Sequence, residues 1–193
     1  MAQNFTITLP SGGVATGRVP GLADLERLGN TRVGCGDQDR WAVSLVQTID
    51  NSPPDFDSMD AADTATIALV VSDFLPDQDE IAHAIESRET HPSGQAFTVE
   101  HEGAAVEVVF TRPTNAHVLQ SKQHGKGIMW AENAQLMRLC LRSVDGKAKS
   151  YQDMRLAWPF DLRTSVVLVE CVQSLKLPSI AAVEAAKGSL RVT

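Results

Sequence analysis

Apolar residues recur along this chain with two spacings, every second position in short segments and every third or fourth position in longer ones. Residues 5–9 alternate between apolar and polar side chains, turn residues occupy 10–13, and residues 14–19 are extended again. This order predicts a β-hairpin. A second hairpin is predicted from residues 97–100 and 105–110, where the later segment is rich in β-branched side chains.

Helical spacing comes after each hairpin. Short helices are predicted over residues 21–28 and 114–120, longer ones over 39–49 and 131–144, and a final pair from two stripes with i, i+3, i+4, i+7 spacing: Ile67, Val70, Val71, Phe74 and Leu168, Cys171, Val172, Leu175. Asp60 and Asp161 stand near the starts of the final pair, where a carboxylate can cap free amides. The Val-rich segment 164–169 leaves a strand open as an alternative.

The two sets of elements occur in the same order. The matched positions are Phe5 and Phe97, Pro20 and Pro113, Leu45 and Cys140, Asp60 and Asp161, at offsets of 92, 93, 95 and 101. The offset only increases, as it does when surface loops gain residues. We therefore expect an α+β fold with an internal duplication, in which each copy is a β-hairpin followed by about three helices. The alternative is one α+β domain with recurrent helix patterns.

The duplication sets the expected domain boundaries. The first copy covers residues 1–76, an acidic linker with one helix covers 77–96, and the second copy with a C-terminal tail covers 97–193. Copies of this size are only marginally stable alone, so they are expected to pack together.

Composition limits the functions that remain. The chain has 43% hydrophobic and 21% charged residues and a net charge of −7, which is typical of a globular protein. It has no apolar stretch near the roughly 18 residues of a membrane span and no signal peptide, so we expect a cytoplasmic protein without membrane contact. No run of Lys or Arg lies along one face, which disfavours a nucleic-acid partner.

The candidate chemical groups are sparse. Cys35, Cys140 and Cys171 are far apart and form no Cys-x-x-Cys pair, which disfavours a disulfide framework or a zinc ribbon. Cys35 lies in a glycine-containing loop and could act as a nucleophile, but none of the five histidines can be assigned to it. We therefore expect no catalytic residue, no metal ligand and no cofactor.

Aromatic residues are the stronger candidates for function. Trp158 and Phe160 flank Pro159 just before the last helix, and Trp130 precedes another helical segment. Such a group can form a hydrophobic staple or exposed anchors for a protein partner, and we expect anchors.

A short sequence motif in the second copy resembles that of a known protein family. Arg112, Pro113 and Thr114 end a strand and lead into a helix, and His117 stands where an aspartate is usual. Across residues 97–178 the chain resembles the tail-assembly and baseplate-hub assembly chaperones of contractile-tailed phages and of contractile injection systems. Asp24 and Leu25 belong to a looser version of the motif in the first copy.

The resemblance implies a non-enzymatic protein that binds other phage tail or baseplate proteins during assembly. It would act in the host cytoplasm or remain in the virion tail, with Arg112, Trp130, Trp158 and Phe160 as candidate binding residues. Many injection-system relatives have Cys-x-x-Cys zinc pairs, which this chain lacks, so no metal role is implied. The alternatives are a structural baseplate component, a small cytosolic enzyme, and an adaptor unrelated to phage.

Overall fold

The computed structural model describes residues 4–27 and 36–177, and it confirms the α+β fold. The first half contains β1 (Asn4–Thr8), β2 (Val14–Arg18), α1 (Leu22–Arg27), α2 (Gly36–Ser44), β3 (Val46–Ile49), the 3-10 turn η1 (Phe56–Ser58) and α3 (Ala61–Ser72). The second half contains α4 (Gln78–Glu86), β4 (Glu89–His91), β5 (Gly94–His101), β6 (Ala104–Phe110), α5 (Asn115–Gly125), α6 (Met129–Cys140), β7 (Leu141–Val144), β8 (Lys147–Ala148), α7 (Tyr151–Leu156) and α8 (Leu162–Ser174).

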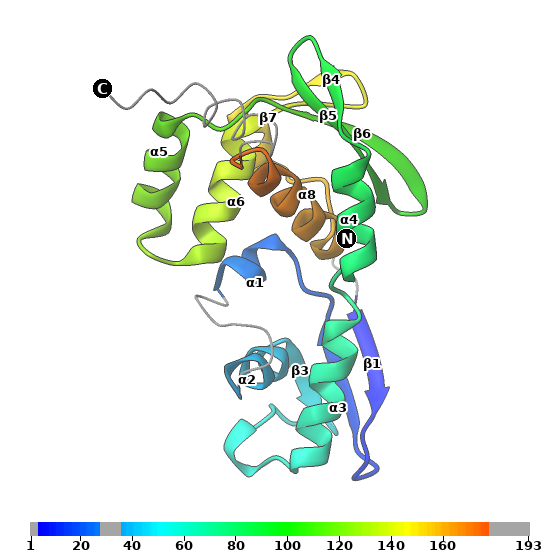
Figure 1. Cartoon of the computed structure of the whole chain (residues 1–193). Coiled ribbons are helices and arrows are strands. Elements are labelled where there is room, and N and C mark those ends of the chain that lie inside the picture. The colour runs from blue at the N-terminus through cyan, green and yellow to red at the C-terminus, as the bar shows by residue number, and fades with distance from the viewer. Residues whose placement is uncertain (1–3, 28–35, 178–193) are drawn as a thin grey trace, which may run out of the picture.

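Each half contains one antiparallel sheet. The strand orders are β1-β2-β3 and β4-β5-β6-β7-β8, and both predicted hairpins are present as β1-β2 and β5-β6. Figure 1 shows the first sheet with α2 and α3 in its lower part and the second sheet with α4, α5, α6 and α8 in its upper part. Helix α1 contacts α6 and α8, and Arg138 donates to Glu26 over 2.6 Å, so the two halves share one core.

The predicted helix starts are confirmed. Asp60 accepts from the Ala62 N–H over 2.7 Å and Asp161 accepts from the Thr164 N–H over 2.8 Å, so both carboxylates cap amides that have no partner inside the helix. Residues 164–169 lie inside the helix α8, whose apolar stripe is buried, so the strand alternative is wrong.

Two predicted helices end earlier than their apolar spacing indicated. Helix α2 ends at Ser44 and is followed after Leu45 by β3, and α6 ends at Cys140 and is followed directly by β7. Residues 46–49 and 141–144 form strands because they pair with the second edge of β2 and of β6. This pairing satisfies backbone groups that would otherwise be buried without a partner.

The expected acidic linker over residues 77–96 is folded. Asp77 and Glu80 form a capping box at the start of α4, which agrees with the helix expected there. Strand β4 then pairs with the first residues of β5, so the segment extends the second sheet. Residues 178–193, the expected tail, lie outside the described residues.

The two halves agree in details of register. The β2-β3 pairing shifts between Thr16 and Gly17, and the β6-β7 pairing shifts between Val109 and Phe110, at the offset of 93 noted in the sequence. Each shift is a β-bulge or similar irregularity at the matching position of its strand.

The residue immediately after β3 or β7 also has the same role in both halves. Asp50 has φ 48° and accepts from the Val14 N–H over 2.8 Å; Asp145 has φ 47° and accepts from the Glu107 N–H over 3.0 Å. These similarities are what a duplication would produce, and the common origin of the halves stays a prediction.

Candidate functional site

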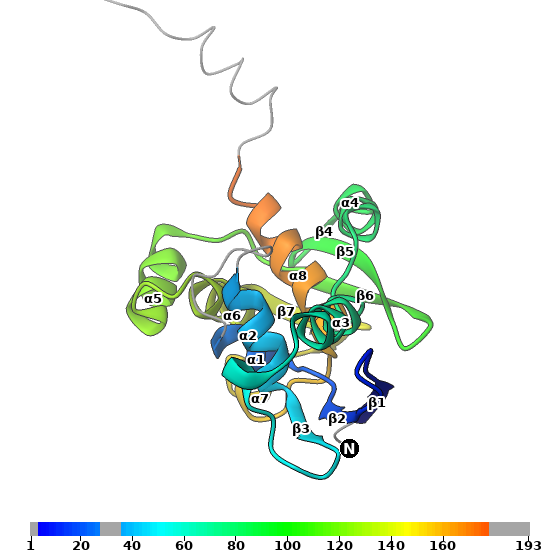
Figure 2. The ribbon, with the colours of Figure 1, turned by 90° about the horizontal axis from the view of Figure 1, so that it is seen from below.

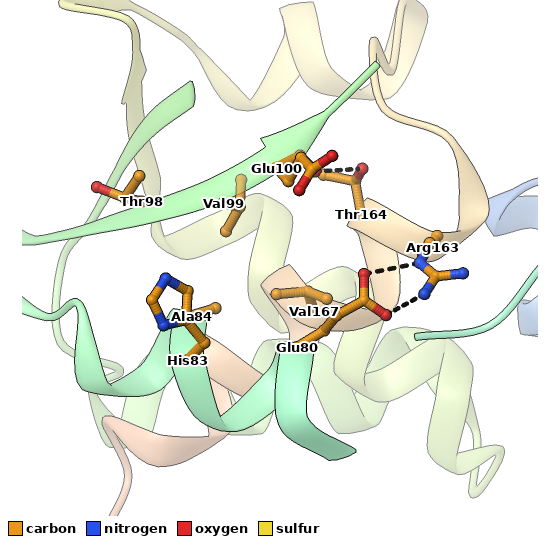
Figure 3. Close-up of a pocket in the computed structure, with 9 residues that line it drawn as sticks. All are labelled: Glu80, His83, Ala84, Thr98, Val99, Glu100, Arg163, Thr164 and Val167. Atoms are coloured by element: carbon orange, nitrogen blue, oxygen red, sulfur yellow. Dashed lines mark hydrogen bonds and ion pairs between the residues drawn. The ribbon is translucent and has the colours of Figure 1, made fainter. Parts of the chain in front are cut away.

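A small groove lies between α4, β5 and the first turn of α8 (Figure 3). It encloses about 80 Å³ and is lined by Glu80, His83, Ala84, Thr98, Val99, Glu100, Arg163, Thr164 and Val167. Pockets that bind drug-sized ligands enclose roughly 300 Å³ or more. The groove alone is suited to water or a single protruding side chain, and an adjoining hollow that shares His83, Thr98, Val99 and Glu100 with it encloses about 260 Å³.

An ion pair closes one end of the groove. The Arg163 guanidinium donates to both carboxylate oxygens of Glu80, with Nε to Oε1 at 2.8 Å, and also to the Asp73 carbonyl. The hydrogen bond from Arg163 lowers the pKa of Glu80 below its usual 4.5. Both side chains are occupied by each other, so the pair fastens α4 to α8 and leaves little for an incoming ligand.

A hydroxyl, an imidazole and a carboxylate meet beside this groove without forming a catalytic triad. The His101 Nδ1 lies 3.2 Å from the Thr164 hydroxyl and 3.8 Å from a carboxylate oxygen of Asp161. In a hydrolase triad the nucleophile and the carboxylate use opposite ring nitrogens. Here both approach the same nitrogen, and Thr164 also donates to the Glu100 carbonyl, so the group fixes the start of α8 against β5.

A cysteine and a histidine also meet, between α5 and α6. The Cys140 Sγ lies 3.7 Å from the His117 Nδ1, a contact that sequence spacing did not reveal. Burial raises the pKa of the Cys140 thiol to about 11, so the thiolate that a nucleophile requires is disfavoured. Burial likewise raises the pKa of Cys171 to about 12. Cys35 lies outside the described residues.

His117 has a structural role at the start of α5. It is the third residue of α5, and its Nδ1 accepts from the backbone N–H of the cap residue Thr114. At the matching position of the first half, Asp24 accepts from the Gly21 N–H over 3.0 Å. His117 and Asp24 therefore have the same role, because each supplies an acceptor for a backbone N–H at the start of its helix.

The expectation that Phe160 is exposed is wrong. Phe160 is 6% exposed, its ring centroid lies 5.1 Å from that of His101, and the core surrounds it. Trp158 is half-buried against Phe160 and donates from Nε1 to the Ser165 hydroxyl over 2.7 Å. The two aromatics therefore pack against the core at the start of α8 and do not form the expected surface anchors.

Arg112 and Trp130 lie at opposite ends of one helical hairpin. Arg112 is exposed just before α5, and Trp130 is half-buried in the first turn of α6. Helices α5 and α6 pack against each other as an antiparallel hairpin, and Figures 1 and 2 place α5 at one side of the molecule. The structure thus brings these two of the four predicted binding residues to one helical hairpin.

Exposed apolar side chains occur on the same hairpin. Leu119 on α5 is 59% exposed, and Ile128 and Met129 between the helices are 39% and 44% exposed. Lys122 in the last turn of α5 and Lys126 directly after this helix are exposed as well. None of the three could have been found from the sequence, because α5 buries Ser121 and Gly125 rather than an apolar stripe, and the other two lie at the loop between the helices.

Three further observations bear on function. Within residues 4–27 and 36–177, no three His, Cys, Asp or Glu side chains gather as metal ligands would. No helix in this described part is long and apolar enough to cross a membrane. No protein-family model matches the chain, and no curated protein or solved structure is significantly similar to it.

Proposed function

We propose that this chain is a non-enzymatic protein of contractile-tail assembly that binds another tail or baseplate subunit. The proposal is supported by the resemblance around Arg112, Pro113 and Thr114 and by the surface to which these residues connect. They lead directly into α5, which carries the exposed Leu119. A second candidate within this class is a structural component that stays in the baseplate.

The observation that carries the proposal is the combination of apolar and basic side chains on the α5–α6 hairpin. Leu119 and Ile128 present apolar area, while Lys122 and Lys126 present positive charge on a chain whose net charge is −7. Exposed apolar groups rimmed by charge are typical of protein interaction surfaces. The partner that fits is a tail subunit with an acidic, partly apolar surface, which the hairpin would cover until assembly.

The test is complementation in the genome that encodes the chain. We expect deletion of the gene to abolish tail particles in electron micrographs and the wild-type gene to restore them. Leu119→Glu should fail to restore them, because it places a charge on the apolar surface and repels an acidic partner. Leu69→Glu on α3 is the matched control, since Leu69 is also an exposed leucine, at 68%, and lies outside the hairpin.

Three outcomes would overturn the proposal. Normal particles after deletion would remove the tail-assembly role, and full complementation by Leu119→Glu would remove the hairpin as the binding surface. Loss of function with Leu69→Glu to the same degree would point to a general effect of added charge. Circular dichroism and melting of both purified variants check that each remains folded.

A further inference from the structure

The cap at the start of α5 depends on a histidine side chain. The backbone N–H of Thr114 donates to the Nδ1 of His117, and the Thr114 hydroxyl accepts from the His117 N–H over 3.2 Å. In most capping boxes the third helical residue is Glu or Gln, whose side chain supplies an oxygen acceptor. Here the acceptor is an imidazole nitrogen, which accepts a hydrogen bond only while it carries no proton.

The contacts of His117 determine which ring nitrogen carries the proton. A backbone N–H can only donate, so the Nδ1 that faces Thr114 is unprotonated and the proton of the neutral ring is on Nε2. The Cys140 Sγ lies 3.7 Å from the same Nδ1. Burial raises the pKa of the Cys140 thiol to about 11, so the thiol is neutral and is at most a weak second donor. This arrangement of the helix start therefore requires a neutral imidazole.

Protonation of His117 removes the acceptor and adds an unfavourable charge. The Nδ1 of a protonated ring is a donor, and it would face the N–H of Thr114, which is also a donor. The added positive charge would lie in the first turn of α5, at the positive end of the helix dipole. Histidine is the side chain whose charge ordinarily changes between about pH 5 and 8, so mild acidification is sufficient.

The charged groups around His117 do not compensate for this charge. Helix α6 is the element that α5 contacts most (Figure 1), and it faces His117 with the neutral Cys140. Arg142 follows in β7, where its charge partly offsets the rise that burial causes in the pKa of Cys140, and the exposed Arg112 precedes α5. The Glu132 carboxylate on α6 accepts from a backbone N–H at the other end of the hairpin. Among the described residues, His117 forms no ion pair with a carboxylate.

The first half provides a comparison without this dependence on pH. At the start of α1, the Gly21 N–H donates to the Asp24 carboxylate over 3.0 Å. An ionised carboxylate accepts without a proton of its own, and ordinary aspartates stay ionised down to about pH 4. The matching position is therefore suited to sense mild acid in the second half and not in the first.

We propose that His117 is a pH-sensitive cap, which holds the first turn of α5 closed at neutral pH and opens it when the imidazole gains a proton. The stabilisation from the cap is present while the ring is neutral and is lost as the pH falls. Leu119, in the same part of α5, belongs to the surface proposed to bind a tail subunit. Acidification should therefore weaken that binding, a consequence that rests on the proposed function, whereas the opening of the turn does not.

Amide hydrogen exchange of the full chain, corrected for the intrinsic effect of pH on exchange, tests the cap. The amides to follow are those of Thr114, which donates to His117, and Val118, which donates to the Thr114 carbonyl over 3.0 Å. We expect their protection to fall about fivefold between about pH 7.5 and 5.5, the usual effect of losing a helix cap. The Gly21 amide, which donates to Asp24, is the control in the same sample and should keep its protection.

The matched variant is His117→Asp, which copies the acceptor of the first half. It should protect Thr114 and Val118 at both pH values, whereas His117→Ala, without an acceptor, should give low protection at both. The proposal is overturned if the wild type protects these amides equally at the two pH values. It is also overturned if His117→Asp loses protection as the wild type does, because another group must then titrate. These measurements need no partner, so their outcome is independent of whether the chain acts in tail assembly.

Discussion

Replacing Phe160 by alanine should destabilise the fold strongly, because the side chain is core and not an exposed anchor. It is 6% exposed and contacts the rings of His101 and Trp158 at centroid distances of 5.1 and 5.4 Å. Removing a buried phenylalanine costs roughly 3–5 kcal/mol. We expect about 3 kcal/mol, at the lower end of that range, because the half-buried Trp158 can move into part of the space.

Urea unfolding measures this difference, and the same segment supplies the control. With a slope of about 2 kcal/mol per molar urea, a loss of about 3 kcal/mol lowers the unfolding midpoint by about 1.5 M. Leu156→Ala removes a leucine that is 80% exposed and should change the free energy of unfolding by less than about 0.5 kcal/mol. If Phe160→Ala shifts the midpoint no more than Leu156→Ala does, Phe160 is not a core residue and this reasoning is refuted.

Two further predictions concern the second half. Gly94→Ala should lower the melting temperature far more than Gly103→Ala: a Cβ at Gly94 would lie 2.1 Å from the Phe110 carbonyl oxygen, whereas Gly103, at φ 76°, has open space and should cost only about 1–2 kcal/mol. Similar losses for the two variants would contradict this packing. Arg163 lowers the pKa of Glu80 from 4.5, so the pair stabilises the fold above pH 4.5, and that contribution is lost as the pH falls through the lower folded-state pKa. The difference in unfolding free energy between wild type and Arg163→Met should therefore shrink below pH 4.5. A difference that does not change with pH would show that the ion pair between Arg163 and Glu80 does not stabilise the fold.

The sequence predicted the elements whose signals are local. Asp60 and Asp161 mark helix starts because a capping carboxylate acts on amides two or three residues away. The two hairpins were predictable because alternating segments and their turn residues are adjacent in the chain. Burial of Cys171 was predictable from the helical stripe, while Val70 on the matching stripe is only half-buried because α3 packs at the margin of the core.

The sequence could not predict elements that depend on distant residues. Strands β3 and β7 continue the apolar spacing of the helices before them, and only pairing with β2 and β6 distinguishes them. Strand β4 has three residues and is a strand only because β5 lies beside it. The burial of Phe160 likewise depends on His101, which is far away in the sequence and is brought close by the packing of α8 against β5.

One difference between the halves is the segment of residues 77–96, which has no counterpart in the first half. It supplies α4, which fastens to α8 through Glu80 and Arg163, and β4, which together with Ser87 covers the edge of β5. Each of these contacts satisfies a backbone group or a charge that would otherwise face water or a partner. Within the described residues, the first half has a three-stranded sheet with a register shift at the matching position, but no segment covers the outer edge of β1. The backbone N–H and C=O groups along this edge of β1 can therefore form hydrogen bonds with another chain.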